Sequence, residues 1–402
     1  MATYKEQNKL NVPHLRFPEF HGEWCISTIG EQFDLYSGNT PSRLNKAHFE
    51  GNVNWITSGE LKEHYISDTK EKISEVAATA NNLKLLHPGT FVIAIYGLEA
   101  DGVRGTGSIT CKESTISQAC MAFTQKGDVK NEFLYSWYKK HGNIIGIKYA
   151  QGTKQQNLSY DILEKFHIAY PSQDEQDKLI KFISLLDERI ATQSKLIEKL
   201  ESLIKGICNN YFEKLSVQEE AYLIRLSDIL KERNEYCCKD GKFIHGTLSK
   251  DGIFPKTGRW DRDFLVKQED KKYKVTHLDD ICYNPANLKF GVICRNTFGD
   301  LIFSPIYVTF EVCKNVNIGF IELYLTNHNF IEKVRRFEQG TVYERMAVSP
   351  EDFLSYKIRI PSYSDQTFFY KKVQWLIKLS QNEMKLLSQY KKLRQYLLRE
   401  MF

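Results

Sequence analysis

The sequence predicts an α+β protein with two globular domains and two long helices that pair as an antiparallel coiled coil. Three observations support this fold class. A stretch of the chain recurs 190 residues later, each copy ends in a heptad pattern of apolar residues, and short β-rich runs separated by turns precede each pattern. A period this long indicates a duplicated domain with its helix, related by a pseudo-twofold axis, rather than a solenoid.

The internal repeat consists of matched residues in a constant order. The first copy contains Gln151-Gly152-Thr153, Leu158-Ser159, Ile168, Pro171-Ser172 and Gln176, and the second contains Gln339-Gly340-Thr341, Val348-Ser349, Ile358, Pro361-Ser362 and Gln366. From Leu158 onward the two copies stay in register as far as Phe212 and Phe402. Chance does not hold a register over so many residues, so we predict a duplication.

The globular parts combine strand-like and helix-like segments. Residues 90–96 and 305–312 are typical of strands, and residues 131–140 and 317–337 are typical of helices. We therefore predict four consecutive parts, which are residues 1–170 (first domain), 171–215 (first long helix), 216–361 (second domain) and 362–402 (second long helix).

The two long helices are predicted from seams of residues spaced alternately by four and three. The first seam is strongly apolar and comprises Leu179, Ile183, Leu186, Ile190, Gln193, Ile197, Leu200, Ile204, Ile207 and Tyr211. The second has three polar interruptions and comprises Phe369, Val373, Leu376, Ser380, Glu383, Leu387, Tyr390, Arg394, Leu397 and Met401. A single helix would expose its apolar seam to water, so we expect the two helices to pair.

Pairing of duplicated halves within one chain should be antiparallel. Gln193 and Glu383 occupy equivalent positions near the helix centres, so we expect them to meet and to fix the coiled-coil register. The alternative is that they are two unrelated polar seam positions that face water.

Composition and charge set limits on the class of protein. The net charge of +5 permits nucleic-acid binding but does not argue for it. The nine cysteines are scattered without metal-binding spacing, which favours reduced thiols and no metal site. We find no apolar run of a signal peptide or membrane span, and we expect a cytoplasmic protein.

With the repeat and the helices established, the chain resembles the specificity subunit of type I restriction-modification systems. Three segments resemble the family's domain entry and first recognition domain: Leu15–Phe20, Ser37-Gly38-Asn39-Thr40-Pro41-Ser42 and Trp55-Ile56-Thr57-Ser58-Gly59-Glu60-Leu61. The repeated Gln-Gly-Thr and Pro-Ser segments resemble the domain exit and the conserved helix. The second domain has neither of the two motifs of the first domain, and reads Gly246–Lys256 instead.

The resemblance implies a non-catalytic subunit that reads double-stranded DNA for partner enzymes. Two unlike domains imply a bipartite, asymmetric target, with the helices acting as a ruler for the unread spacer. It also implies two methyltransferase subunits and restriction subunits as partners. S-adenosylmethionine, ATP and Mg would belong to those partners, and this chain would hold no cofactor.

Several segments bear a weak likeness to catalytic or cofactor-binding motifs, and none of them predicts chemistry. The chain has no phosphate-binding loop of the ATPase type. Asn284-Pro285-Ala286-Asn287 lacks the second proline and the aromatic residue of amino-methyltransferases, so we interpret it as a turn after a strand. Gly102, Gly105 and Gly107 are followed by a strand pattern, whereas a cofactor site needs a helix there. The equivalent His87 and His277 are interpreted as structural.

The candidate DNA contacts are polar or basic residues on expected loops, where they could reach base edges or phosphates. In the first domain they are Thr40, Ser42, Arg43, Ser58, Lys62, Tyr96, Arg104, Lys154, Gln155 and Gln156. In the second domain they are Lys250, Lys256, Arg259, Asn284, Asn287, Lys289, Arg295, Tyr343 and Arg345. Residues 154–156 are preferred, because they follow the repeated Gln-Gly-Thr turn.

Two alternatives to a reader subunit stay open at this point. One is a methyltransferase or nuclease that carries its own recognition domains, which would need a cofactor or metal motif. The other is an adaptor whose coiled coil joins proteins without DNA. Methyl transfer by the purified chain alone would favour the first alternative, and absence of sequence-dependent DNA retention would favour the second.

Overall fold

The computed structural model describes residues 11–100, 102–152, 156–238, 243–250, 252–255, 272–338 and 347–402. The chain forms two compact units, residues 1–193 with 386–402 and residues 194–385. Each unit therefore contains one globular domain and part of both long helices, α5 (Gln173–Val217) and α9 (Tyr363–Met401). The predicted division into four consecutive parts does not anticipate that both helices are shared between the units.

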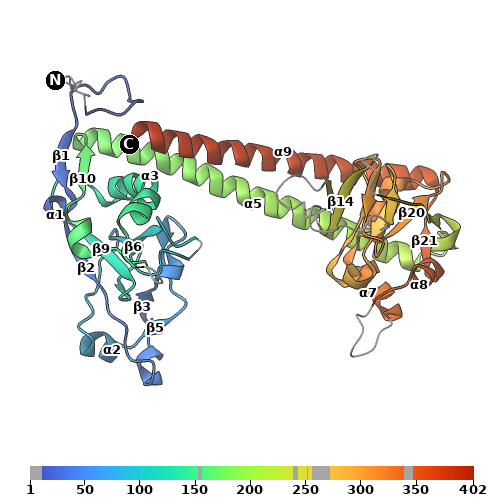
Figure 1. Cartoon of the computed structure of the whole chain (residues 1–402), viewed down its shortest axis with the longest axis horizontal. Helices are drawn as coiled ribbons and strands as arrows, with labels where there is room; N and C mark the ends of the chain where they lie inside the picture. Colours follow the sequence, from blue (N-terminus) through green and yellow to red (C-terminus); the bar gives the residue numbers. More distant parts are fainter. Residues whose placement is uncertain are drawn as a thin grey trace. The chain divides into compact units, whose positions relative to one another are not determined.

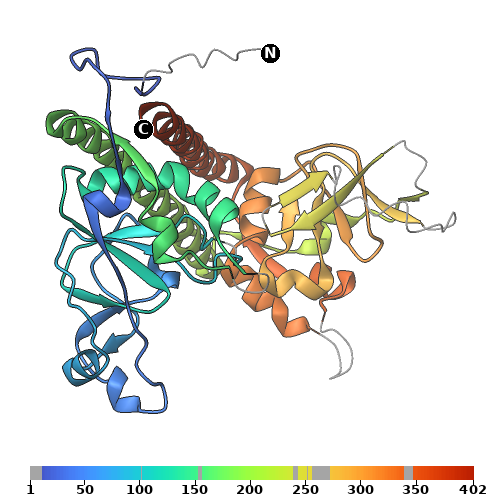
Figure 2. The same ribbon diagram turned by 60° about the vertical axis from the view of Figure 1, so that its left-hand side comes forward.

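The first unit is built on two β-sheets. The larger sheet has the order β2-β9-β6-β7-β4, made of Phe33–Ser37, Cys120–Gln125, Phe91–Ala94, Gly107–Thr110 and Tyr65–Ile66. The smaller has the order β5-β3-β8, made of Lys72–Ile73, Val53–Ile56 and Ser114–Ile116. Its short helices are α1 (Ile29–Gln32), η1 (Lys46–Phe49), η2 (Ser58–Glu60), α2 (Glu75–Ala80) and α4 (Tyr160–Leu163). Helix α3 (Asn131–Tyr149) lies between the larger sheet and the long helices (Figures 1 and 2).

The second unit also contains two sheets. One has the order β12-β20-β17-β18, made of Leu230–Glu232, Val308–Val312, Ile281–Tyr283 and Ile293–Arg295. The other has the order β13-β16-β19-β14-β15, made of Tyr236–Cys237, Tyr273–Thr276, Leu301–Phe303, Ile244–Ser249 and Gly252–Pro255. Short helices complete the unit: η3 (Leu226–Asp228), η6 (Pro285–Phe290), α6 (Ile318–Leu325), α7 (His328–Val334), η7 (Arg335–Phe337) and α8 (Pro350–Ser355).

The duplication is confirmed at the entry to each long helix. Each long helix is preceded by its own two-stranded antiparallel ribbon. Before α5 the ribbon pairs β1 (Cys25–Thr28) with β10 (His167–Tyr170), and before α9 it pairs β11 (Tyr222–Arg225) with β21 (Lys357–Ile360). The second strand of each ribbon leads through Pro-Ser into α5 or α9. The predicted strands and helices of both domains are present as β6, β20, α3 and the α6–η7 segment.

A buried glutamine repeats its hydrogen bonds in both units. The Gln176 side-chain amide donates to the Pro171 carbonyl at 3.1 Å, and its oxygen accepts from the Lys130 backbone N–H at 3.0 Å. Gln366 likewise donates to Pro361 at 2.9 Å and accepts from Asn317 at 2.9 Å. Lys130 and Asn317 are the N-caps of α3 and α6, so each glutamine fastens a domain helix to its long helix.

The predicted antiparallel pairing of the long helices is confirmed within each unit. In the first unit Asp187 of α5 pairs with Arg394 of α9, and in the second unit the Tyr211 and Phe369 rings stack at 3.7 Å. The start of α5 therefore meets the end of α9, and its end meets the start of α9. Every residue of the two predicted seams is buried or half-buried.

The register prediction concerns residues of different units. Gln193 is buried in the first unit and Glu383 is half-buried in the second. Their mutual contact stays a prediction.

Candidate nucleic-acid interface

The loop after β2 carries the first group of candidates, Thr40, Ser42 and Arg43. The two terminal nitrogens of Arg43 donate to the two carboxylate oxygens of Glu71, both at 2.8 Å, and this ion pair lowers the pKa of Glu71. The guanidinium also lies over the rings of Phe49 at 4.9 Å and Trp55 at 5.8 Å. Arg43 is exposed, so its charge is oriented by Glu71 and the rings while it stays open to solvent.

Trp55 joins the two sequence motifs of the first domain. Its indole N–H donates to the Asn39 carbonyl at 3.2 Å, and the Asn39 N–H donates to the Ile116 carbonyl at 3.3 Å. A Cβ at Gly38 would lie 1.9 Å from the Ile116 oxygen, so glycine is required for this approach. These hydrogen bonds thus hold the two motifs, residues 37–42 and 55–61, next to each other in the fold.

Ser58 and Lys62 lie on a second, adjoining loop. Ser58 opens η2, whose Glu60 carboxylate accepts from the Thr57 N–H at 2.8 Å and from the Lys70 N–H at 2.7 Å. This carboxylate joins the loop to the segment of Lys70, and Lys62, two residues after Glu60, is exposed. The loop therefore presents an exposed lysine beside a hydrogen-bonded turn.

Two candidates that are distant in sequence meet in a third place. The Arg104 guanidinium donates to the Gln156 side-chain oxygen at 2.9 Å, and the Gln156 N–H donates to the Glu99 carboxylate at 2.8 Å. The Leu98 N–H bonds the Gln156 carbonyl at 3.1 Å, in the segment that follows Tyr96. The structure thus brings the loop of Tyr96 and Arg104 against the loop of the Gln-Gly-Thr turn.

In the second unit, candidates on η6 and β18 take part in the fold. The buried Asn284 caps η6, its side-chain oxygen accepting from the Ala286 N–H at 3.1 Å. Arg295 pairs with Asp279 at 2.6 Å and with Glu322 at 3.6 Å. Asn287 and Lys289 are half-buried on the same η6. Among the candidates of this unit that the structure describes, only Lys250 lies exposed, at the β14–β15 turn. Asn284-Pro285-Ala286-Asn287 follows the strand β17, as interpreted from the sequence, but it forms the N-cap and first residues of the 3-10 helix η6 rather than a turn.

Six candidates lie outside the described residues: Lys154, Gln155, Lys256, Arg259, Tyr343 and Arg345.

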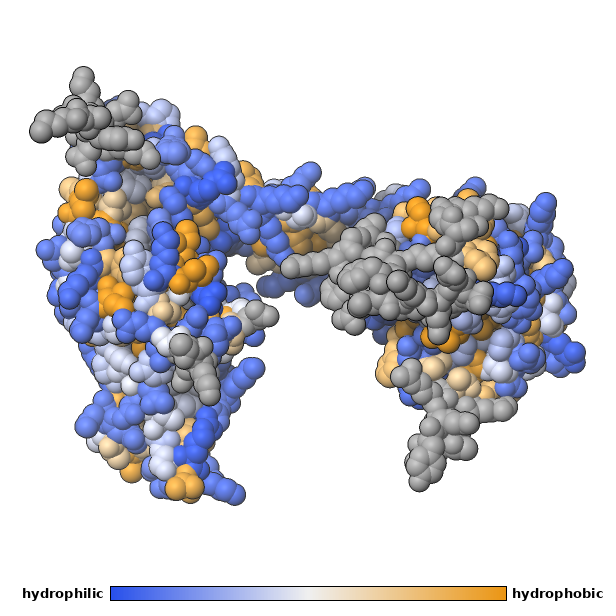
Figure 3. All heavy atoms as spheres, viewed as in Figure 1, coloured by the Kyte–Doolittle hydropathy of each residue, from blue (hydrophilic) through white to orange (hydrophobic). Residues whose placement is uncertain are grey.

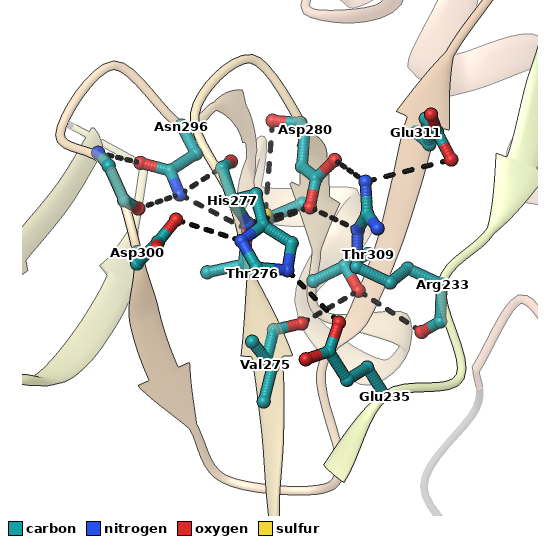
Figure 4. Close-up of polar contacts among 12 residues, drawn as sticks. Arg233, Glu235, Val275, Thr276, His277, Asp280, Asn296, Asp300, Thr309 and Glu311 are labelled. Carbon is teal, nitrogen blue, oxygen red and sulfur yellow. Dashed lines mark hydrogen bonds and ion pairs between the residues drawn. The ribbon is translucent and has the colours of Figure 1, made fainter. Parts of the chain in front are cut away.

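A polar network that the sequence analysis did not anticipate surrounds His277 in the second unit (Figure 4). His277 bonds Glu235 at 3.0 Å and Asp300 at 2.8 Å, and these two carboxylates raise its pKa, with Glu235 the larger cause. Beside it, Arg233 donates twice to Asp280, at 2.9 and 3.0 Å. The acidic partners make this network a support of the domain rather than a phosphate-binding surface.

The buried amide of Asn296 and the buried ammonium of Lys274 extend this network. The Asn296 side chain donates to the carbonyls of His277 and Gly299 at 2.8 and 2.7 Å. Lys274 donates to Glu232 at 3.1 Å and to the Asn234 side chain at 2.9 Å. The sequence equivalence of His277 with His87 was the only signal in this region, and His87 is exposed.

No group of three or more His, Cys, Asp or Glu side chains suited to a metal ion occurs in the described ranges. A search of those ranges also finds no helix with the length and apolar character of a membrane span.

Comparison with known proteins relates this arrangement to one class. Residues 21–202 match the family model of the type I restriction modification DNA specificity domain. Two curated relatives from Methanocaldococcus jannaschii are the MjaIX specificity subunit, 27% identical over 194 residues, and the MjaVIII specificity subunit, 25% identical over 216 residues, both of type I restriction enzymes. The matches cover 47% and 53% of this chain, but only 44% and 47% of the relatives.

Solved structures share the fold over almost the whole chain. The type I restriction-modification S subunit from M. genitalium superimposes with a TM-score of 0.60 at 18% identity, covering 97% of this chain and 99% of that one. A chain from a study of complex assembly and conformational transition of the type I R-M system gives 0.58 at 13% identity, covering 93% and 96%. The fold is therefore that of a two-domain S subunit. Residues 21–202 therefore match the DNA specificity domain of type I restriction-modification systems, and these comparisons support the resemblance seen in the sequence.

Proposed function

We propose that this chain is the DNA-reading subunit of a type I restriction-modification complex and performs no catalysis itself. Each globular domain would read one half of a bipartite, asymmetric site in double-stranded DNA. The observation that carries the proposal is the combination of a strict repeat in the long helices with unlike domains. The Gln176 and Gln366 hydrogen bonds repeat, whereas the Trp55 motif of the first domain has no counterpart in the second.

The proposed partners are two methyltransferase subunits, and restriction subunits that join that core. A partner present twice should bind equivalent surfaces of the repeat. One such surface is a row of leucines beside the seam, with Leu196 and Leu203 on α5 and their equivalents Leu386 and Leu393 on α9. Leu203 and Leu393 are 51% and 44% exposed, and Leu203 borders a hollow of about 480 Å³ beside Gly206. Exposed apolar side chains at matched positions favour two copies of one partner.

The stoichiometry of the complex tests this docking proposal. We expect mass measurements to find two methyltransferase subunits on the wild-type chain, one on L203E or L393E, and none on the double variant. The control is L278E, which changes an exposed leucine outside the long helices. Two bound subunits on the double variant would contradict this docking surface.

We further propose that adenine methylation, ATP-driven translocation and cleavage, with S-adenosylmethionine, ATP and Mg, belong to the partners. A subunit that acts on the host chromosome would work in the cytoplasm. Mapping methylated adenines in a host with and without this gene tests the function, because one bipartite motif should disappear. Exchanging residues 220–360 for those of another family member should change one half-site only, and a change in both would contradict independent reading.

A further inference from the structure

The β-turn at residues 87–90 of the first unit recurs at residues 277–280 of the second. In both turns the N–H of the fourth residue donates to the carbonyl of the first, at 3.3 and 3.2 Å. The third residue has a positive φ in both, 85° and 75°, as in a type II turn. Its N–H donates to the carbonyl of Thr110 in the first unit and of Asn296 in the second, at 2.7 and 2.8 Å. The two turns are therefore the same feature of the repeat.

The residues that build this turn differ between the two units. The first unit has Pro88 and Gly89, which are the residues that a type II turn favours at its second and third positions. The second unit has Leu278 and Asp279 at the equivalent positions. Because Pro-Gly builds the same turn in the first unit, the fold does not require a leucine and an aspartate here. These two residues therefore point to a role besides building the turn.

Leu278 exposes its side chain beside a second apolar residue. It is 58% exposed, and Phe298, in the adjoining turn of residues 296–299, is 55% exposed. The Asn296 backbone joins the two turns with hydrogen bonds of 2.8 and 2.7 Å. The corresponding segment of the first unit, residues 111–113, contains no large apolar residue. Hydrophobic side chains are visible on the surface of the second unit (Figure 3).

The buried side chain of Asn296 holds the turn that carries Phe298. Its oxygen accepts from the N–H groups of Phe298 and Gly299 at 2.9 and 3.3 Å. Its amide donates to the carbonyls of His277 and Gly299 at 2.8 and 2.7 Å, and Figure 4 shows these bonds. Leu278 and Phe298 thus stand on backbone that is already ordered, which lowers the entropy cost of binding a partner.

The charge around the two apolar side chains is negative. Three carboxylates on or beside the two turns are 45–59% exposed, and they belong to Glu235, Asp279 and Asp300. The cations that pair with them, His277 and Arg295, are only 30% and 19% exposed. Solvent therefore meets mainly the acidic members of these pairs. Such a surface repels the phosphates of DNA and attracts lysine and arginine.

The first unit does not share this combination of residues. The methyltransferase subunits proposed above would bind equivalent surfaces of the repeat twice, so a surface of the second unit alone fits a different partner. We propose that Leu278 and Phe298, with the carboxylates around them, form a docking site for a protein segment that places an apolar side chain between lysine or arginine residues. This partner would bind once per chain.

The test measures binding of a fluorescent peptide to the full-length chain. The probe carries a Leu-Trp pair between two arginines on either side, and the control peptide carries glutamates in place of the arginines. We expect the wild type to bind the basic peptide and not the acidic one. L278P/D279G gives the second unit the turn residues of the first, so it should stay folded while the binding weakens at least about tenfold. F298A should weaken the binding in the same direction.

Matched variants separate the contribution of charge from that of apolar contact. D279N/D300N removes two carboxylates and keeps the turn, because asparagine also adopts a positive φ. It should weaken the binding and make it less dependent on salt. The control is E113Q, which changes an exposed carboxylate beside the equivalent turn of the first unit and should leave the affinity within roughly twofold of wild type. Circular dichroism and melting temperature verify that each variant is folded.

Three outcomes would overturn the proposal. In the first, the wild type binds both peptides equally or binds neither. In the second, folded L278P/D279G binds the basic peptide as tightly as the wild type does. In the third, sedimentation shows a wild-type dimer that L278P/D279G does not form, which would assign the surface to a second copy of this chain. None of these measurements involves DNA or methylation, so they are independent of the test of the proposed function.

Discussion

Arg394 of α9 holds Asp187 of α5 with two guanidinium nitrogens, Nε on Oδ1 and Nη2 on Oδ2 at 3.0 Å. The equivalent positions in the second unit are Ile204 and Ile377, which are packed against its core. Arg394 is one of the polar interruptions of the second seam, and the ion pair accounts for it. The two ends of a duplicated helix pair are thereby chemically different.

The first domain supports this ion pair from the side. His64 contacts Asp187 at 3.7 Å and Glu132 at 2.8 Å, and its ring stacks between Tyr65 and Tyr135 at 4.1 and 3.9 Å. Burial raises the pKa of Tyr65 to about 12, with the nearby Glu132 carboxylate adding to the shift. The domain, α5 and α9 therefore share one polar network.

Breaking the Asp187–Arg394 pair should destabilise the first unit. R394L leaves Asp187 with a partly buried charge, and we expect a loss of roughly 2–4 kcal/mol in the free energy of unfolding. D187I/R394I copies the isoleucines of the second unit and should restore most of it, because neither charge is then left unpaired. Urea unfolding, with hydrogen exchange of α3 as the reporter of the first unit, measures both. A double variant less stable than R394L would contradict this account.

The repeated glutamines allow a comparison within one chain. Q176L and Q366L each leave a backbone N–H, of Lys130 or Asn317, without its acceptor, so each should cost roughly 1–3 kcal/mol. We expect Q176L to increase hydrogen exchange in α3 alone, and Q366L in α6 alone. The exposed Gln381 of α9 provides the control, Q381L, which should change neither helix. Loosening of both helices by one variant would show that the units do not respond separately.

The sequence predicts the duplication and the long helices well, because a heptad pattern is local and its burial follows from its period. It does not predict which polar residues bond one another over long separations. His64, Glu132 and Asp187 carry no shared motif, and their contacts arise only when α3 packs on α5. Residue type was also a poor guide to the candidate site. Asn284 and Arg295 are residue types that can read bases, but the Asn284 side-chain oxygen accepts a hydrogen bond in a helix cap and the Arg295 guanidinium donates in an internal ion pair.

The raised pKa of His277 predicts a pH dependence of the second unit. A group whose pKa is higher in the folded state stabilises the fold. That stabilisation is complete when the pH lies below the pKa of the group in the unfolded state, which is near 6.5 for His277. It is lost as the pH rises through the pKa of the folded state. We therefore expect the second unit to become less stable from mildly acidic to mildly alkaline pH, by at most about 1 kcal/mol because the partners are solvent-exposed. H277Q should flatten this slope in hydrogen exchange of β16. An unchanged slope would exclude His277 as its source.

If the first domain reads DNA as proposed, we expect substitutions of Arg43 and of Glu71 to change the DNA affinity in opposite directions. R43Q removes a cation that would contact a phosphate or base, so DNA affinity of the assembled complex should fall and the salt dependence should become shallower. E71Q removes an anion beside the same surface and frees the guanidinium, so affinity should rise. Both variants lose the same exposed ion pair and should have similar stability, which separates binding from folding. The measurement is a salt titration of binding to a duplex carrying the methylated motif, with D68N as the control for an exposed acid paired elsewhere. Equal weakening by R43Q and E71Q would mean that the pair supports the loop and that Arg43 does not contact DNA.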